Sequence, residues 1–192
     1  MKTDRKWVVV RIDGKIAGVS TDYGLLSRIV SKISSSAGAG KVPYGEIVAS
    51  TVGFDEVSKL RSQVQWEDMV LFGTEFQKRV WRKLYDITHT EGQPARLLSY
   101  SDFAELCDNP AGVRAVAHAV GLNPVSVIIP CHLIVPKEAI DKIDDIQKKA
   151  ASTIFKGDDL CLTSILSDTS VDFGEYALGR DLKRTLIIKD LA

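Results

Sequence analysis

The pattern of hydrophobic and polar positions predicts a small region of strands and one helix at the start of the chain. Lys6–Ile12 is rich in β-branched residues and predicts a strand. Asp13-Gly14 is a typical two-residue hairpin turn, so Lys15–Ser20 is expected to return as the partner strand. Apolar residues at helical spacing over Leu25–Ile33 predict a helix, and the small residues Ser34–Gly40 predict a loop.

Further along, the pattern predicts a series of short helices. Thr74 is a suitable N-cap for the first, and Ser99 for a second that runs to Leu106. The turn at Asp108–Pro110 leads into a third helix over Val113–Val120. The second and third helices predict a helix-turn-helix, although many helix hairpins of this kind bind nothing. The apolar face of the first helix consists of Phe76, Val80, Trp81 and Leu84.

Composition places the chain among ordinary globular proteins. Its 192 residues are 45% hydrophobic and 26% charged, which excludes a disordered or collagen-like chain and suits one large or two small domains. Three cysteines are too few for a disulfide scaffold. The first 13 residues lack the apolar run of a signal peptide, and no apolar run approaches the ~20 residues of a membrane span. We therefore expect a soluble protein of a reducing, intracellular compartment with no membrane partner.

The charge balance of zero argues at first against a nucleic-acid partner. The chain has 25 basic and 25 acidic residues, and a basic footprint is the usual sign of such a partner. However, residues 136–173 hold 5 basic and 8 acidic residues, so the remainder carries a net charge of +3. A basic stripe in this remainder is either a DNA-facing surface or a solvated helix face, and it consists of Lys78, Arg79, Arg82 and Lys83.

Ile129-Pro130-Cys131-His132 is the segment with the clearest chemical character. A histidine beside a cysteine can act as a base that raises the thiolate fraction, which makes the cysteine a nucleophile. The alternative is a buried cysteine that packs as a small hydrophobe. No metal site is expected, because paired ligand spacing is absent among the other thiol and imidazole residues, Cys107, Cys161, His89 and His118.

Taken in order, these segments resemble the O6-alkylguanine-DNA alkyltransferases, also called methylated-DNA–protein-cysteine methyltransferases. The resemblance covers residues 73–135 and 174–190. The matching segments are Gly73-Thr74-Glu75-Phe76-Gln77, Leu98-Ser99-Tyr100, Asn109-Pro110, Arg114-Ala115-Val116, Asn123-Pro124, Ile129-Pro130-Cys131-His132 and Phe173-Gly174-Glu175-Tyr176 with Lys183.

The resemblance implies an α/β (α+β) fold. Residues 1–70 form a small ribonuclease H-like domain of mixed sheet and helix. Residues 71–192 form a winged-helix-like domain that contains the helix-turn-helix and the active site. The implied partner is double-stranded DNA containing O6-alkylguanine, the implied protein is a monomer, and no cofactor is needed. The implied location is the cytoplasm or nucleoid of a bacterium, or the nucleus of a eukaryote.

The implied reaction is a single, irreversible transfer of the alkyl group from guanine O6 to Cys131. His132 acts as the base, and Asp190, where the family usually has glutamate, orients it. Tyr100 donates to the leaving guanine, and Asn123 braces the turn that holds the active site.

The resemblance also implies how DNA is bound. The base is flipped out through the minor groove, and Arg114 fills the space that it leaves. The other implied DNA contacts are Ala115, Ala119, Ser99, Lys78 and Arg82, and the implied substrate pocket contains Tyr176, Ile134 and Ala177.

The chain departs from the family pattern at several points. Leu133 replaces the usual arginine after Cys-His, and His118 replaces a small residue. The largest departure is an insertion of roughly thirty residues within 136–172. Helical periodicity over Ala139–Phe155 predicts a helix, followed by a loop that carries Cys161. We expect the insertion to cover the active-site mouth, to contact DNA, or only to pack on the flank.

Two other functions stay open at this stage. One is a module that binds alkylguanine lesions without efficient transfer, which the replacements at Leu133 and Asp190 would allow. The other is a cysteine hydrolase, which needs an oxyanion hole and a substrate cleft for which the sequence shows no motif.

Overall fold

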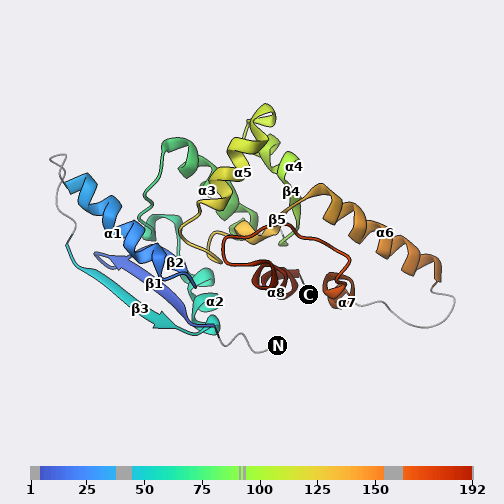
Figure 1. Cartoon of the computed structure of the whole chain (residues 1–192), viewed down its shortest axis with the longest axis horizontal. Helices are drawn as coiled ribbons and strands as arrows, with labels where there is room; N and C mark the ends of the chain where they lie inside the picture. Colours follow the sequence, from blue (N-terminus) through green and yellow to red (C-terminus); the bar gives the residue numbers. More distant parts are fainter. Residues whose placement is uncertain (1–4, 38–44, 91, 93, 154–161, 192) are drawn as a thin grey trace. The chain divides into compact units, whose positions relative to one another are not determined.

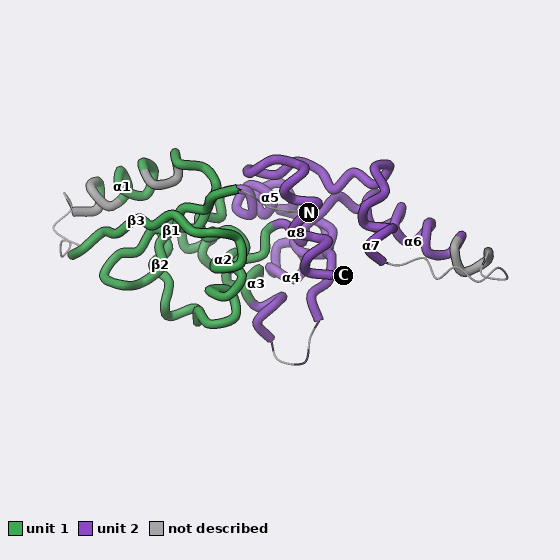
Figure 2. Tube along the Cα trace, turned by 90° about the horizontal axis from the view of Figure 1, so that it is seen from below, with its two compact units in different colours: residues 1–85, 122–131 green, residues 86–121, 132–192 purple. Residues whose placement is uncertain are grey.

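The computed structural model describes residues 5–37, 45–90, 92, 94–153 and 162–191. The chain consists of two compact units, shown in green and purple in Figure 2. Unit 1 contains residues 1–85 and 122–131, and unit 2 contains residues 86–121 and 132–192. The two compact units are defined by contacts alone and do not test the predicted domains 1–70 and 71–192. The domain division therefore stays a prediction.

Unit 1 is built on a three-stranded antiparallel sheet with the strand order β2-β1-β3 (Figure 1). Strands β1 (Trp7–Ile12) and β2 (Lys15–Ser20) confirm the predicted hairpin. The turn between them places Asp13 at φ 50° and Gly14 at φ 80°. Both angles lie in the left-handed region that an Asp-Gly turn of this type requires.

The third strand and the helix after it were not predicted. Strand β3 (Ile47–Val52) pairs with β1 and is exposed along most of its length. Helix α2 (Phe54–Gln63) and the short helix η1 (Trp66–Asp68) follow it. Helix α1 (Gly24–Ala37) contains the predicted helix and contributes to the buried cluster of Val8, Val10, Ile12, Ala17 and Ile29.

Helix α3 (Glu75–His89) begins where the sequence predicts. The Thr74 hydroxyl accepts from the backbone N–H of Gln77 at 3.2 Å, and the Gln77 side chain accepts from the N–H of Thr74 at 2.9 Å. This reciprocal capping satisfies two backbone donors that the helix itself leaves unbonded. The buried face of the helix holds Val80, Trp81, Leu84 and Tyr85.

The helix-turn-helix lies in unit 2 and has the predicted bounds to within a few residues. Helix α4 (Tyr100–Leu106) follows strand β4 (Leu98–Ser99), and the Ser99 hydroxyl accepts from Asp102 N–H at 3.0 Å as the N-cap. The short helix η2 (Pro110–Gly112) then leads into α5 (Val113–Gly121). The turn helix η3 (Cys131–Leu133) precedes strand β5 (Ile134–Val135), which pairs in parallel with β4.

Helix α6 (Lys137–Thr153) confirms the predicted helix of the insertion over residues 139–153. The remainder of that prediction, with Phe155 and the loop carrying Cys161, lies outside the described residues. Helices α7 (Leu162–Ser167) and α8 (Arg180–Leu191) complete unit 2. The insertion supplies five of the eight buried residues of a cluster that contains Val135, Ala139, Ile143, Ile165, Leu166, Val171, Phe173 and Ile187.

Strand β5 and helix α8 contribute Val135 and Ile187 to the same cluster, so the inserted helices are part of the hydrophobic core of unit 2. The apolar face of the insertion thus packs on unit 2, and whether the insertion also covers the active-site mouth or contacts DNA stays a prediction. Together the two units make a mixed helix-and-sheet chain, as the sequence predicts.

Candidate functional site

The turn from Asn123 to Cys131 is organised around one amide side chain. The Oδ1 atom of Asn123 accepts from Val125 N–H at 3.0 Å, while its Nδ2 atom donates to the carbonyl of Ile129 at 2.8 Å and to Sγ of Cys131 at 3.1 Å. A short polar side chain that bonds its own following backbone is a common way to close a turn. The same side chain thus shapes the turn and places a donor on the sulfur.

This turn is buried and anchored to the sheet of unit 1. Val19 donates to the carbonyl of Pro124 at 2.9 Å, and Ser126 donates to the carbonyl of Val19 at 2.9 Å. Val127 has a φ of 73°, which is rare for a β-branched residue and costs backbone free energy. Such strain persists only where surrounding contacts determine the conformation, and here it lies four residues before a cysteine that is 6% exposed.

His132 and Asp190 lie together in unit 2. His132 is fully buried, and its Nε2 atom lies 2.8 Å from Oδ2 of Asp190 on α8. A carboxylate accepts hydrogen bonds, so Nε2 carries the proton of this pair and Nδ1 is the basic nitrogen. The shorter side chain of aspartate therefore reaches the histidine without the extra methylene of glutamate.

Tyr100 begins α4 and is half-buried in unit 2. The Nζ atom of Lys183, on α8, lies 5.9 Å from the centre of its ring. Lys183 is 1% exposed and donates to the carbonyl of Glu175 at 3.4 Å. A cation over an aromatic ring is attracted by the ring's negative face, so this contact holds the tyrosine ring beside α8.

Among the predicted DNA contacts of the helix-turn-helix, Arg114 and Ala115 are exposed on α5, together with His118. Ser99 and Ala119 are each 1% exposed, so a DNA contact at these two positions stays a prediction that their burial does not favour. The Ser99 side chain is used to cap α4. Ala119 faces inward because it lies on the same side of α5 as the buried residues Val116 and Val120.

The basic stripe of α3 makes contacts within unit 1. The Nζ atom of Lys78 lies 3.0 Å from a carboxylate oxygen of Glu75. Arg82 is exposed, and its guanidinium lies 5.2 Å from the Trp66 ring and 3.8 Å from a carboxylate oxygen of Glu67. Each partner carboxylate offsets part of the positive charge, so DNA binding by Lys78 and Arg82 stays a prediction that requires these pairs to rearrange.

The three predicted pocket residues differ in exposure. Ile134 is fully buried in β5, Tyr176 is half-buried, and Ala177 is exposed. Tyr176 and Ala177 lie in the loop that precedes α8. The grouping of these residues around a substrate stays a prediction.

The basic residues of α8 have no role predicted from the sequence. The segment that joins α7 to α8 accepts hydrogen bonds from Arg180, Lys183 and Arg184. Lys183 and Arg184 follow Arg180 by three and four residues, and this spacing in the sequence indicates that the three basic side chains share one face of a helix.

The described part of the chain shows neither a metal-binding cluster nor a membrane-spanning helix. No three of its His, Cys, Asp and Glu side chains are grouped as a metal site requires. Over the same residues, none of the helices combines the length and the apolar character needed to span a bilayer.

The middle of the chain matches a known protein family. Residues 75–150 match the family described as 6-O-methylguanine DNA methyltransferase, DNA binding domain. This range begins at α3 and contains the helix-turn-helix, the Asn123–Cys131 turn and most of α6.

Curated relatives carry the corresponding names. A probable methylated-DNA–protein-cysteine methyltransferase of Acanthamoeba polyphaga mimivirus is 44% identical over 70 residues, which is 36% of this chain and 44% of the relative. The Haemophilus influenzae methylated-DNA–protein-cysteine methyltransferase is 46% identical over 66 residues, 34% of each chain. The Kluyveromyces lactis protein of that name is 27% identical over 69% of this chain and 64% of its own length. The matched part thus spans less than half of the first two relatives.

One solved structure supports the fold over the whole chain. The O6-methylguanine-DNA methyltransferase of Pyrococcus kodakaraensis aligns with a TM-score of 0.53 over 100% of this chain and 96% of its own. Its sequence identity is 19%, so this likeness concerns the fold alone.

Proposed function

We propose that the protein repairs alkylated DNA by direct reversal, because residues 75–150 match the family described as 6-O-methylguanine DNA methyltransferase, DNA binding domain. It acts as a single-turnover methylated-DNA–protein-cysteine methyltransferase. The alkyl group moves from guanine O6 in double-stranded DNA to Sγ of Cys131, and the protein is consumed. The observation that carries the proposal is the donor contact of 3.1 Å from Asn123 to this buried sulfur within the matched domain.

The nucleophile is the thiolate of Cys131. Its proton passes to Nδ1 of His132, directly or through water, while Asp190 holds Nε2 and stabilises the resulting imidazolium. The amide of Asn123 donates to the sulfur and so favours the negatively charged form. A thiolate suits this reaction because a soft, weakly solvated anion attacks an alkyl carbon efficiently.

In the transfer step, an S–C bond forms as the C–O6 bond breaks. The electron pair of the broken bond remains on the guanine, which leaves as an anion. Tyr100 neutralises that anion by giving a proton to the base, and Lys183 over its ring keeps the phenol in place. The product is an S-alkylcysteine, which has no thiolate to react again.

The DNA side of the proposal rests on α5. The exposed Arg114 and Ala115 face the minor groove, and the arginine occupies the space of the flipped base. We also propose a ribonuclease H-like description for the N-terminal domain and a winged-helix-like one for the C-terminal domain. A monomer working in a reducing compartment inside the cell fits a reaction that depends on a free thiol.

The decisive experiment is a mass measurement after reaction with DNA. The protein is incubated with duplex containing O6-methylguanine, and its intact mass and peptide map are recorded. We expect one methyl group on Cys131 and none in Cys131→Ser. Cys107→Ser is the matched control, because Cys107 is a half-buried cysteine of the helix-turn-helix and should leave transfer unchanged. Tight binding to the lesion without a mass change would contradict the proposal in favour of a lesion-binding module.

A further inference from the structure

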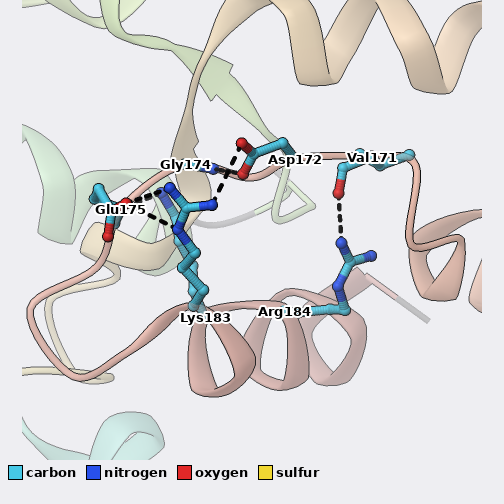
Figure 3. A network of polar contacts seen from close by, with 7 residues as sticks. Val171, Asp172, Gly174, Glu175, Lys183 and Arg184 are labelled. Atoms are coloured by element: carbon cyan, nitrogen blue, oxygen red, sulfur yellow. Dashed lines mark hydrogen bonds and ion pairs between the residues drawn. The ribbon is translucent and has the colours of Figure 1, made fainter.

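The segment that returns from the insertion is fastened to α8 by three basic residues. Arg180, Lys183 and Arg184 are spaced three and four residues apart, so they share one face of the helix. Figure 3 shows the bonds from this face to residues 171–175, where Arg184 reaches the carbonyl of Val171. These contacts lie entirely within unit 2.

Arg184 makes the most extensive of these contacts. One terminal nitrogen donates to the carbonyl of Leu166 at 2.7 Å and to the carbonyl of Asp168 at 2.9 Å, and the other donates to the carbonyl of Val171. Its guanidinium also lies 4.8 Å from the centre of the Phe173 ring. The planar guanidinium presents five N–H donors in a fixed fork, so it reaches acceptors on two sides that a single ammonium cannot all reach. Arg184 therefore satisfies carbonyls at the end of α7 and fixes the chain that follows.

The chain before the insertion and the chain after it meet at Pro136 and Gly174. Gly174 has a φ of 76°, and a β-carbon there would lie 2.9 Å from Cγ of Pro136. Pro136 immediately precedes α6, and Gly174 lies seven residues beyond α7. The chain thus leaves and returns at one place, and the insertion forms a side branch that is closed at its base.

The other two basic residues fasten the next part of the segment. Arg180 bonds to a carboxylate oxygen of Glu175, which holds the pKa of that carboxyl below its usual range. Lys183 binds the main-chain carbonyl of Glu175. Tyr176 follows directly, so the position of this tyrosine depends on how firmly the segment is held to α8. The same helix carries Asp190, which bonds to His132.

We infer that Arg184 is a positioning residue that limits the size of the alkyl group this protein accepts, an inference that rests on the proposed function. It holds the segment between α7 and α8 against α8 through the carbonyls of Leu166, Asp168 and Val171, and so keeps Tyr176 in a fixed position beside the substrate. Without the hydrogen bonds of Arg184, Tyr176 can move aside for a bulky alkyl group. A methyl group needs no such movement, so its transfer is not helped.

The test compares two duplexes of the same sequence, one with O6-methylguanine and one with O6-benzylguanine. Arg184→Met keeps an apolar stem against Phe173 but removes the three hydrogen bonds. We expect the ratio of benzyl to methyl transfer rates to rise roughly fivefold, a change typical of one pocket contact. In the matched control Arg28→Met, the exposed ion pair with Asp22 in unit 1 is lost, and the ratio should stay within about twofold of the wild-type ratio.

The pH dependence of methyl transfer should not change in Arg184→Met, because His132 and Asp190 are both retained. An unchanged ratio of rates in folded Arg184→Met would overturn the inference. If this variant does not fold, Arg184→Lys decides, because a single ammonium can replace only part of the bonding and should give a smaller rise in the same ratio. No rise in Arg184→Lys would then overturn it. If the wild-type chain transfers neither group to Cys131, the proposed function itself fails.

Discussion

The turn from Asn123 to Cys131 and the inserted helices α6 and α7 differ in what holds them in place. The turn depends on the hydrogen bonds of one amide side chain and contains a strained Val127. The insertion depends on apolar packing, with Ala139, Ile143 and others in the core of unit 2.

The difference predicts that the inserted helices tolerate substitution better than the turn does. Apolar packing is non-directional, so a helix with a suitable apolar face can be added wherever a core surface receives it. A turn that aims a sulfur at one carbon requires directional bonds, because small displacements of reacting groups reduce the rate strongly. Substitutions in the turn should therefore affect transfer, and substitutions in the insertion should affect stability.

The largest effect is expected for Asn123→Ala. This change removes the donor to Cys131 and both bonds that shape the turn. We expect single-turnover transfer to O6-methylguanine duplex to slow by roughly 100-fold, as for the loss of one donor at other charged reaction centres.

The companion variant is Asn123→Asp, which keeps the acceptor for Val125 but loses the donor to both the sulfur and the carbonyl of Ile129. It should be at least as slow as Asn123→Ala, because its carboxylate repels the thiolate. A fast Asn123→Asp would show that transfer does not need the donor to the sulfur.

A smaller effect is expected for Asp190→Asn. The amide can still bond to Nε2 of His132 but does not stabilise the imidazolium, so transfer should slow by about 10- to 100-fold. The loss should shrink as the pH rises and a larger fraction of Cys131 ionises without help. Rates measured from pH 6 to 9 test this, and a constant ratio to the wild-type rate would argue against a base at His132.

The smallest effect on transfer is expected in the insertion. Ile143→Ala removes a side chain that is buried in the cluster of unit 2, and we expect a loss of roughly 2–4 kcal/mol in the free energy of unfolding. Transfer well below the melting temperature should stay within about twofold of wild type, since the site chemistry is untouched.

Lys137→Ala is the matched control on the same helix. It breaks an exposed pair with Asp141 and should leave the melting temperature unchanged. If Ile143→Ala slowed transfer as strongly as Asn123→Ala, the contrast between the two regions would be lost, and the insertion would belong to the catalytic apparatus.

The sequence by itself determined the features that neighbouring residues decide. The Asp13-Gly14 hairpin, the caps at Thr74 and Ser99 and the bounds of α4 follow from local backbone preferences and short-range hydrogen bonds. The cysteine motif was also visible, because its residues are consecutive. These are interactions between groups that the chain already holds close together.

Only the tertiary structure decided what depends on distant partners. Strand β3 has no clear alternation, and it is defined by its pairing with β1. Ser99 and Ala119 are compatible in sequence with either a surface or a core, and packing buried both. The contacts of Arg184 with Leu166, Asp168 and Val171 join positions 13 to 18 residues apart. Such contacts depend on how the core assembles, because burial and non-local bonding are properties of the whole fold and not of a local sequence pattern.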